Sequence, residues 1–145
     1  MRRPDWLSPT TAGRRQAERL IEGPHDGAWF WNSDDRGKDP TPWFSVMLEK
    51  PSVVEWLYIR WKAKYGSVGP RAMKYRVLSS LDGTSWTETG VDQSQVPGLS
   101  PELAIEVLPG WAAPTRYIKV EMSESSYGKD GYFSCRYVLV TGRPV

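Results

Sequence analysis

The sequence predicts an all-β fold, an antiparallel β-sandwich of the jelly-roll type with little helix. Segments in which apolar and polar residues alternate recur along the 145-residue chain, and this period of two is typical of strands with one buried face. Stretches rich in Gly and Pro separate these segments, as in other all-β domains. The eight Trp and seven Tyr also favour strands, because aromatic side chains pack well on a pleated surface.

The clearest strand signal is the segment from Tyr75 to Trp86, YRVLSSLDGTSW. Tyr75 and Val77 fall on one face of a strand. Asp82-Gly83 supplies the turn, since Gly tolerates a positive φ and Asp bonds the local backbone. A second strand begins at Ser85-Trp86. The segment therefore predicts a hairpin that serves as scaffold.

The longest predicted strand is Val53–Lys62. Period-two alternation assigns it one apolar face and one mixed face. The apolar face consists of Val53, Leu57, Ile59 and Trp61, and the mixed face of Val54, Trp56, Tyr58, Arg60 and Lys62. The other predicted strands are Phe44–Leu48, Leu103–Leu108, Arg116–Met122 and Tyr132–Thr141. Four tryptophans are predicted to be packing residues: Trp6, Trp56, Trp61 and Trp86.

The first third of the chain is less regular. Residues up to about Ala12 are expected to be irregular, and Arg14–Ile21 to form one or two helical turns. Gly23–Trp43 holds many Gly, Pro, Asn and Asp residues without a sustained period. A long loop of this kind in a compact domain is usually functional.

Length and composition indicate how many domains the chain forms and which structural features it can have. A chain of this size is expected to form a single domain, residues 1–145, with a core at about 17–142 and residues 1–16 as an N-terminal extension. The single cysteine, Cys135, excludes an intrachain disulfide and is expected to be a buried apolar residue. No apolar run is long enough to span a membrane, and the N-terminus lacks the apolar segment of a signal peptide.

Several motifs occur together in a characteristic order. They are the apolar pair in Leu20–Gly23, the strand Trp43–Leu48, the strand Val54–Trp61, the hairpin Tyr75–Trp86, the run Thr115–Val120 and the closing strand Tyr137–Gly142. In this order the chain resembles the discoidin family, also called the coagulation-factor C-type domain, a group of galactose-binding-like jelly rolls. The resemblance covers about Ala17 to Gly142. It implies a β-sandwich that binds ligands through loops at one end, and it leaves the ligand open because this fold hosts many functions.

Two departures from the family pattern concern the disulfide and the metal ion that stabilise many of its members. Many secreted members join their termini by a disulfide, which one cysteine cannot form. Many bacterial members hold a structural Ca²⁺ through an Asp-Gly pair and a Glu in the last strand, where this chain has Glu22 and Tyr137. Ca²⁺ needs six to eight oxygen ligands, so no cofactor is expected. The weak Ca²⁺ candidates are Asp26, Asp34 and Asp39.

The sequence holds no catalytic motif. His25 is the only histidine, and no nucleophile elbow, zinc-protease motif or phosphate-binding loop occurs. We therefore predict a binding protein rather than an enzyme.

Three loops carry the candidate binding residues. A sugar presents an apolar C–H face to an aromatic ring and a set of hydroxyls to Arg, Asn or Asp. The candidate ligand-binding residues are His25, Trp29, Trp31, Asn32, Arg71, Tyr127 and Tyr132. Each has an alternative structural role: one of Trp29 and Trp31 as core, Arg71 as partner of a carboxylate, and the tyrosines as loop anchors.

The predicted function is a non-catalytic adhesion module for a glycan or glycoprotein. Two alternatives stay open: a protein-interaction domain of a larger intracellular assembly, and binding to a phospholipid surface through loop aromatics, which is less favoured because acidic residues offset Arg36 and Lys38. Nucleic acid is not expected at a net charge of +2. The resemblance implies an extracellular or cell-surface location, whereas the lone cysteine and missing signal peptide favour the intracellular alternative.

Overall fold

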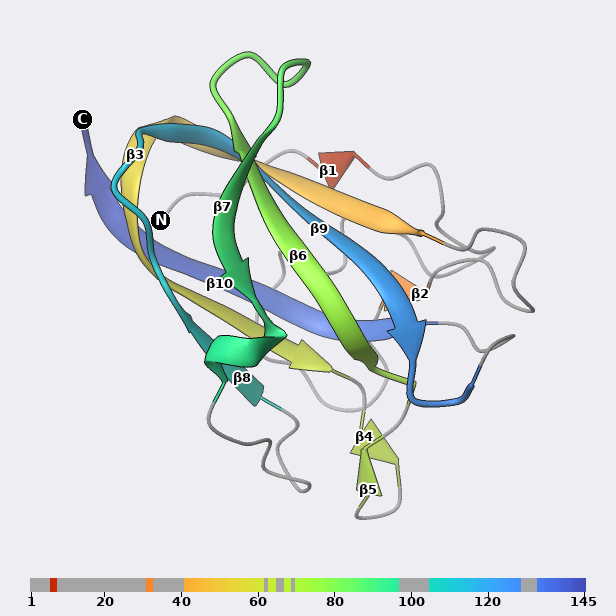
Figure 1. Cartoon of the computed structure of the whole chain (residues 1–145). Helices are drawn as coiled ribbons and strands as arrows, with labels where there is room; N and C mark the ends of the chain where they lie inside the picture. The colour runs from red at the N-terminus through yellow and green to blue at the C-terminus, as the bar shows by residue number, and fades with distance from the viewer. Residues whose placement is uncertain are drawn as a thin grey trace.

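A computed structural model of the chain describes residues 6–7, 31–32, 41–61, 63–64, 67–68, 70–96, 105–128 and 133–145, with the backbone alone described at 6–7, 31–32, 63–64 and 67–68. These residues form strands and one short 3-10 turn (Figure 1), which confirms the predicted all-β fold. The strands are β1 (Trp6–Leu7), β2 (Trp31–Asn32), β3 (Trp43–Trp61), β4 (Ala63–Lys64), β5 (Ser67–Val68), β6 (Ala72–Ser80), β7 (Thr87–Asp92), β8 (Ile105–Pro109), β9 (Thr115–Ser125) and β10 (Ser134–Pro144), and the turn is η2 (Gln93–Gln95).

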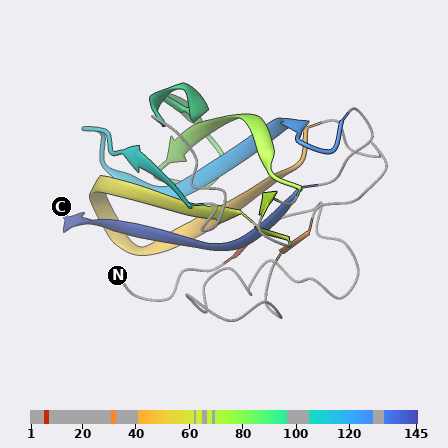
Figure 2. The ribbon, with the colours of Figure 1, turned by 90° about the horizontal axis from the view of Figure 1, so that it is seen from below.

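Strand β3 connects the two layers of the sandwich. Its first half, from Trp43 to Met47, pairs with β1 and β9. Its second half pairs with β10 from Ser52 onward and with β8 from Trp56 to Arg60. The β9 layer continues through β6 to β7, and the β10 layer ends at β2. Figure 2 shows β3 passing at one end of the molecule from one layer into the other. The two strands predicted at Phe44–Leu48 and Val53–Lys62 are therefore one bent strand.

The core lies between these layers. It is built from alternate residues of each strand, as the period-two pattern requires. The most deeply buried large side chains are Trp61, Phe44, Leu48, Leu57, Ile59, Leu108, Ile118 and Met122.

One part of the predicted alternation is wrong. Val54 is buried and Val53 only partly so, while Glu55 and Trp56 are both exposed. The pairing register shifts here, with Trp56 opposite Thr141 but Val54 opposite Gly142. A β-bulge adds a residue to one strand and so changes the face of every residue before it. The prediction that Trp56 packs is also wrong, because 47% of its surface is exposed.

The Asp82-Gly83 turn is confirmed. The Asp82 Oδ1 atom accepts hydrogen bonds from the backbone N–H groups of Thr84 and Ser85, both at 2.8 Å, and Gly83 has a φ of +81°. The second strand begins at Thr87, slightly later than predicted. Trp86 packs as expected, edge-on to Tyr117 with ring centroids 6.4 Å apart.

Candidate functional site

Several chain segments meet at the end of the sandwich where β6 begins, which we call the Arg71 end. The backbone N–H of Ser126 donates to the Arg71 carbonyl at 2.9 Å, and the Arg71 N–H donates to the Ser126 hydroxyl at 3.0 Å. The Ser134 N–H donates to the Pro70 carbonyl at 2.7 Å. The starts of β6 and β10 and the turn after β9 are therefore held together.

Four of the predicted ligand-binding residues are brought to this end. In β2, Asn32 pairs with Ser134 and Trp31 with Cys135, at the start of β10. Tyr127 follows Ser126 in the turn after β9, beside Arg71. Residues distant in the sequence thus meet because antiparallel strands begin and end at the same edge.

The remaining candidates lie outside the described residues. These are His25, Trp29 and Tyr132, together with the weak Ca²⁺ candidates Asp26, Asp34 and Asp39. The predicted helical turns at Arg14–Ile21 and most of the Gly23–Trp43 loop also fall there. Among the residues that are described, no group of three or more His, Cys, Asp or Glu side chains could hold a metal ion.

Arg71 is oriented by a buried carboxylate. Its Nη1 atom lies 3.7 Å from Oε2 of Glu106, whose side chain is 3% exposed, against 20% for that of Arg71. Oε1 of the same carboxylate accepts hydrogen bonds from the Trp61 indole N–H at 2.5 Å and from the Tyr75 hydroxyl at 3.2 Å. A buried charge is tolerated when it is paired and hydrogen-bonded in this way.

The electrostatics of this group follow from its burial. Removal from water raises the pKa of Glu106, and the hydrogen bonds from Trp61 and Tyr75 and the positive charge of Arg71 only partly oppose that shift. Burial also raises the pKa of the Tyr75 hydroxyl, with the neighbouring Glu106 charge adding to the effect. The Tyr75 hydroxyl therefore stays neutral and donates its hydrogen bond to Glu106. Glu106 pairs with the Arg71 guanidinium from the buried side.

Glu106 was not among the residues predicted from the sequence. It lies in the segment Ile105–Pro109 on the same face as Leu108, which is fully buried. A carboxylate at a core position of an amphipathic strand is rare unless it has a partner. The alternation of buried and exposed positions in this strand is the sequence signal that could have identified Glu106. A carboxylate at a buried position indicates a cation or hydrogen-bond donor nearby.

Tyr127 gives the Arg71 end an accessible aromatic ring. It lies in a turn closed by the Gly128 N–H, which donates to the Ser125 carbonyl at 3.1 Å. Its side chain is 49% exposed, which fits a ring that can stack on a ligand. Arg71 and Tyr127 together offer a planar hydrogen-bond donor and an apolar face, which is the pair of groups that recognises a sugar.

Cys135 and Tyr137 have structural roles near this end. Cys135 is fully buried, as predicted, and its burial raises the pKa of the thiol. Tyr137, where the resemblance leads us to expect a Glu, is buried with the Arg60 guanidinium carbon 5.8 Å from its ring centroid. The last strand therefore supplies no carboxylate at this position.

The described strands form an antiparallel β-sandwich. The family model of the F5/8 type C domain matches residues 7–136. The chain belongs to this family, which confirms the resemblance to discoidin and coagulation-factor C-type domains.

Several solved structures with a similar fold are carbohydrate-binding modules. A family 32 carbohydrate-binding module, CBM32-3, from a family 31 glycoside hydrolase of Clostridium perfringens is similar with a TM-score of 0.75 and 16% identity, covering 94% of this chain and 88% of that one. The family 32 module of C. perfringens NanJ in complex with galactose is similar with a TM-score of 0.74 and 17% identity. The match covers 95% of this chain and 93% of that one. Chitosan-binding module 1 of a Paenibacillus chitosanase/glucanase is similar with a TM-score of 0.71 and 21% identity. The match covers 97% of this chain and 96% of that one.

No match was found among curated protein sequences. Within the described residues, no helix has the length and apolar character needed to cross a membrane.

Proposed function

We propose that this chain is a non-catalytic carbohydrate-binding module that holds a glycan at the Arg71 end. The observation that carries the proposal is the Arg71 guanidinium, which is paired with buried Glu106. The Arg71 backbone is also hydrogen-bonded to Ser126, so the half-exposed Tyr127, the next residue, belongs to the same end of the sandwich. Structural relatives in complex with galactose and with GalNAc-β-1,3-galactose support a glycan as partner.

The physical basis is preorganisation. An arginine that is already ordered by an ion pair loses little conformational entropy when it donates to sugar hydroxyls. A tyrosine ring adds rigid apolar area for the C–H face of a sugar at a small entropic cost. The sequence candidates His25, Trp29, Trp31, Asn32 and Tyr132 are proposed to contribute to the same site.

The test is a glycan array followed by calorimetry with the best glycan. Arg71→Ala should weaken binding by about 10-fold or more, since a charge-assisted hydrogen bond contributes roughly 1.5–3 kcal/mol. Tyr127→Ala should also weaken binding, because the apolar contact between the ring and the sugar is lost. Matched controls are Arg143→Ala, at the other end of β10, and Trp56→Ala, on the outer face of β3. Both controls should bind like the wild type.

Two results would overturn the proposal. One is an array on which the wild type binds no glycan, and the other is unchanged affinity in both site variants. Vesicle flotation with anionic phospholipid tests the membrane-surface alternative. Lipid binding without glycan binding would replace the proposed partner.

A further inference from the structure

We infer that the opposite end of the sandwich carries a second saccharide-binding groove, built around Trp111. This groove is separate from the Arg71 end: β6 begins beside Arg71 and ends at Ser80, which lines the groove. At about 3.3 Å per strand residue, the two ends are about 30 Å apart. The inference goes beyond the proposed function and does not require it.

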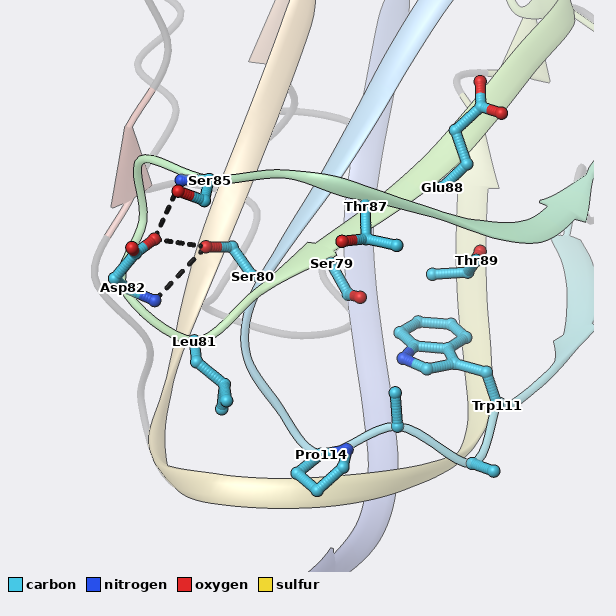
Figure 3. A pocket seen from close by; sticks show the side chains of 12 residues that line it. Ser79, Ser80, Leu81, Asp82, Ser85, Thr87, Glu88, Thr89, Trp111 and Pro114 are labelled. Atoms are coloured by element: carbon cyan, nitrogen blue, oxygen red, sulfur yellow. Dashed lines mark hydrogen bonds between the residues drawn. The ribbon is translucent and has the colours of Figure 1, made fainter.

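The groove lies between the two layers, where the core reaches the surface. It has a volume of about 540 Å³, within the range of small-molecule sites. One wall is the end of β6 with the turn at 81–85 and the start of β7, and the other is the β8–β9 loop from Trp111 to Pro114. Figure 3 shows the Trp111 ring beside Ser79, Thr87 and Thr89, with Leu81 and Pro114 at the far side.

Trp111 supplies a fixed apolar surface. Its ring is partly buried against the core, and its indole N–H donates to the Thr115 hydroxyl at 2.7 Å. Its backbone N–H donates to the Val54 carbonyl at 3.2 Å. Because the polar atom of the ring is already satisfied within the protein, the lining part of the indole presents its apolar surface, which suits the C–H face of a sugar.

Two hydroxyls complement this ring. Ser79 and Thr87 face each other across β6 and β7 and both line the groove. Neither hydroxyl makes a hydrogen bond to another residue in the described part of the chain. A hydroxyl donates one hydrogen bond and accepts two, so this pair matches the alternating donors and acceptors around a sugar ring.

Both walls are rigid before any ligand arrives. The turn at 81–85 is held by Asp82, which accepts from Thr84, Ser85 and the Ser80 hydroxyl at 2.8–2.9 Å. The β8–β9 loop is tied to β3 by the Gly110 N–H, which donates to the Glu55 carbonyl at 2.9 Å. Binding here would order little of the chain, which lowers its entropic cost.

The charges of the groove select the sugar. Its described lining contains no Lys or Arg, and its charged residues are Asp82 and Glu88. Glu88 is paired with Arg76, and Figure 3 shows its side chain directed away from Trp111. A carboxylate at the rim disfavours an anionic ligand. The groove therefore fits a neutral or amine-bearing sugar and disfavours sialylated or sulfated ones.

The experiment is a two-dimensional NMR titration of the ¹⁵N-labelled protein with galactose, a chitosan tetrasaccharide, cellotetraose and sialyllactose. We expect shifts in residues 79–81, 87–89 and 111–113 with at least one of the first three sugars, and weaker or no shifts there with sialyllactose. Thr87→Val should weaken the affinity measured from the groove shifts about 3- to 10-fold, whereas Thr141→Val, at an exposed position of β10 outside the groove, should not.

Arg71→Ala separates the two sites. If the groove shifts persist in this variant, the second site stands whatever happens at the Arg71 end. Trp111→Ala should abolish the groove shifts, and Thr87→Val covers the case in which it does not fold. The inference is overturned if none of the first three sugars shifts the groove, if Thr87→Val leaves the groove affinity unchanged, or if sialyllactose binds there most tightly.

Discussion

Arg71 and Glu106 join the two layers of the sandwich, with 3.7 Å between Nη1 and Oε2. Arg71 precedes β6 in the β9 layer, and Glu106 lies in β8 of the β10 layer. The same carboxylate accepts from Trp61 on β3 and Tyr75 on β6. One buried acid thus connects the candidate glycan site to the core, and its removal should affect both.

Glu106→Ala should destabilise the domain by about 2–5 kcal/mol, because it leaves the buried donors of Trp61 and Tyr75 unsatisfied at roughly 1–3 kcal/mol each. Urea unfolding followed by tryptophan fluorescence measures the change. Glu124→Ala, at an exposed position of β9, should stay within about 0.5 kcal/mol of the wild type. Equal stability of the two variants would contradict the role assigned to Glu106.

The pH dependence of stability should differ between the wild type and Glu106→Gln. The pKa of Glu106 is raised in the folded protein, so between its unfolded pKa and its folded pKa the native state binds more protons than the unfolded state. The free energy of unfolding should therefore rise as pH falls through that window, and the rise should be complete near the unfolded pKa of about 4.3. Glu106→Gln should lack this contribution. If the free energy of unfolding changed with pH in the same way for both proteins, the prediction would be wrong.

Gly110→Ala should be strongly destabilising, by about 3 kcal/mol or more. A Cβ at this position would lie 1.8 Å from the Val54 carbonyl oxygen, which is a backbone atom, so the β8–β9 loop would have to move away from β3. Gly90→Ala is the control, since no atom lies within 4 Å of its added Cβ and only its positive φ opposes the change, at about 1–2 kcal/mol. Thermal unfolding of both variants compares them, and a smaller loss at Gly110 than at Gly90 would refute the close approach.

Two of the three tryptophans of β3, Trp56 and Trp61, should differ in how much their substitution destabilises the domain. Trp61 is fully buried, whereas Trp56 is 47% exposed on the outer face. Trp61→Ala should cost about 3–5 kcal/mol or prevent folding, and Trp56→Gln should cost less than about 1 kcal/mol. Denaturant midpoints provide the measurement. A comparable loss for both would show that Trp56 packs after all, as the sequence pattern had predicted.

Cys135 should be inert in the native state. Its thiol is fully buried and its pKa is raised by that burial, so the reactive thiolate is scarce and inaccessible. Labelling with a chromogenic disulfide reagent should be complete in denaturant and should follow unfolding in native buffer. Fast stoichiometric labelling of the folded protein would contradict this.

The candidate site shows where prediction from sequence stops. Arg71 and Tyr127 were identified because arginine and aromatic residues in loops suit a sugar, and the structure brings both to one end. Glu106 and the Trp111 groove were missed. Each depends on a neighbour from another strand, and a single sequence does not show which strands are neighbours.

The sequence by itself determined the all-β class, the hairpin at Asp82-Gly83, most of the buried face of β3 and the burial of Cys135. These features follow from local chemistry, namely period-two alternation, positive φ at Gly and the apolar character of a run. The tertiary structure alone decided the bend that joins two predicted strands into β3 and the bulge that exposes Trp56. It also decided the ion pair between Arg71 and Glu106, because such long-range contacts depend on how the layers pack rather than on any local pattern.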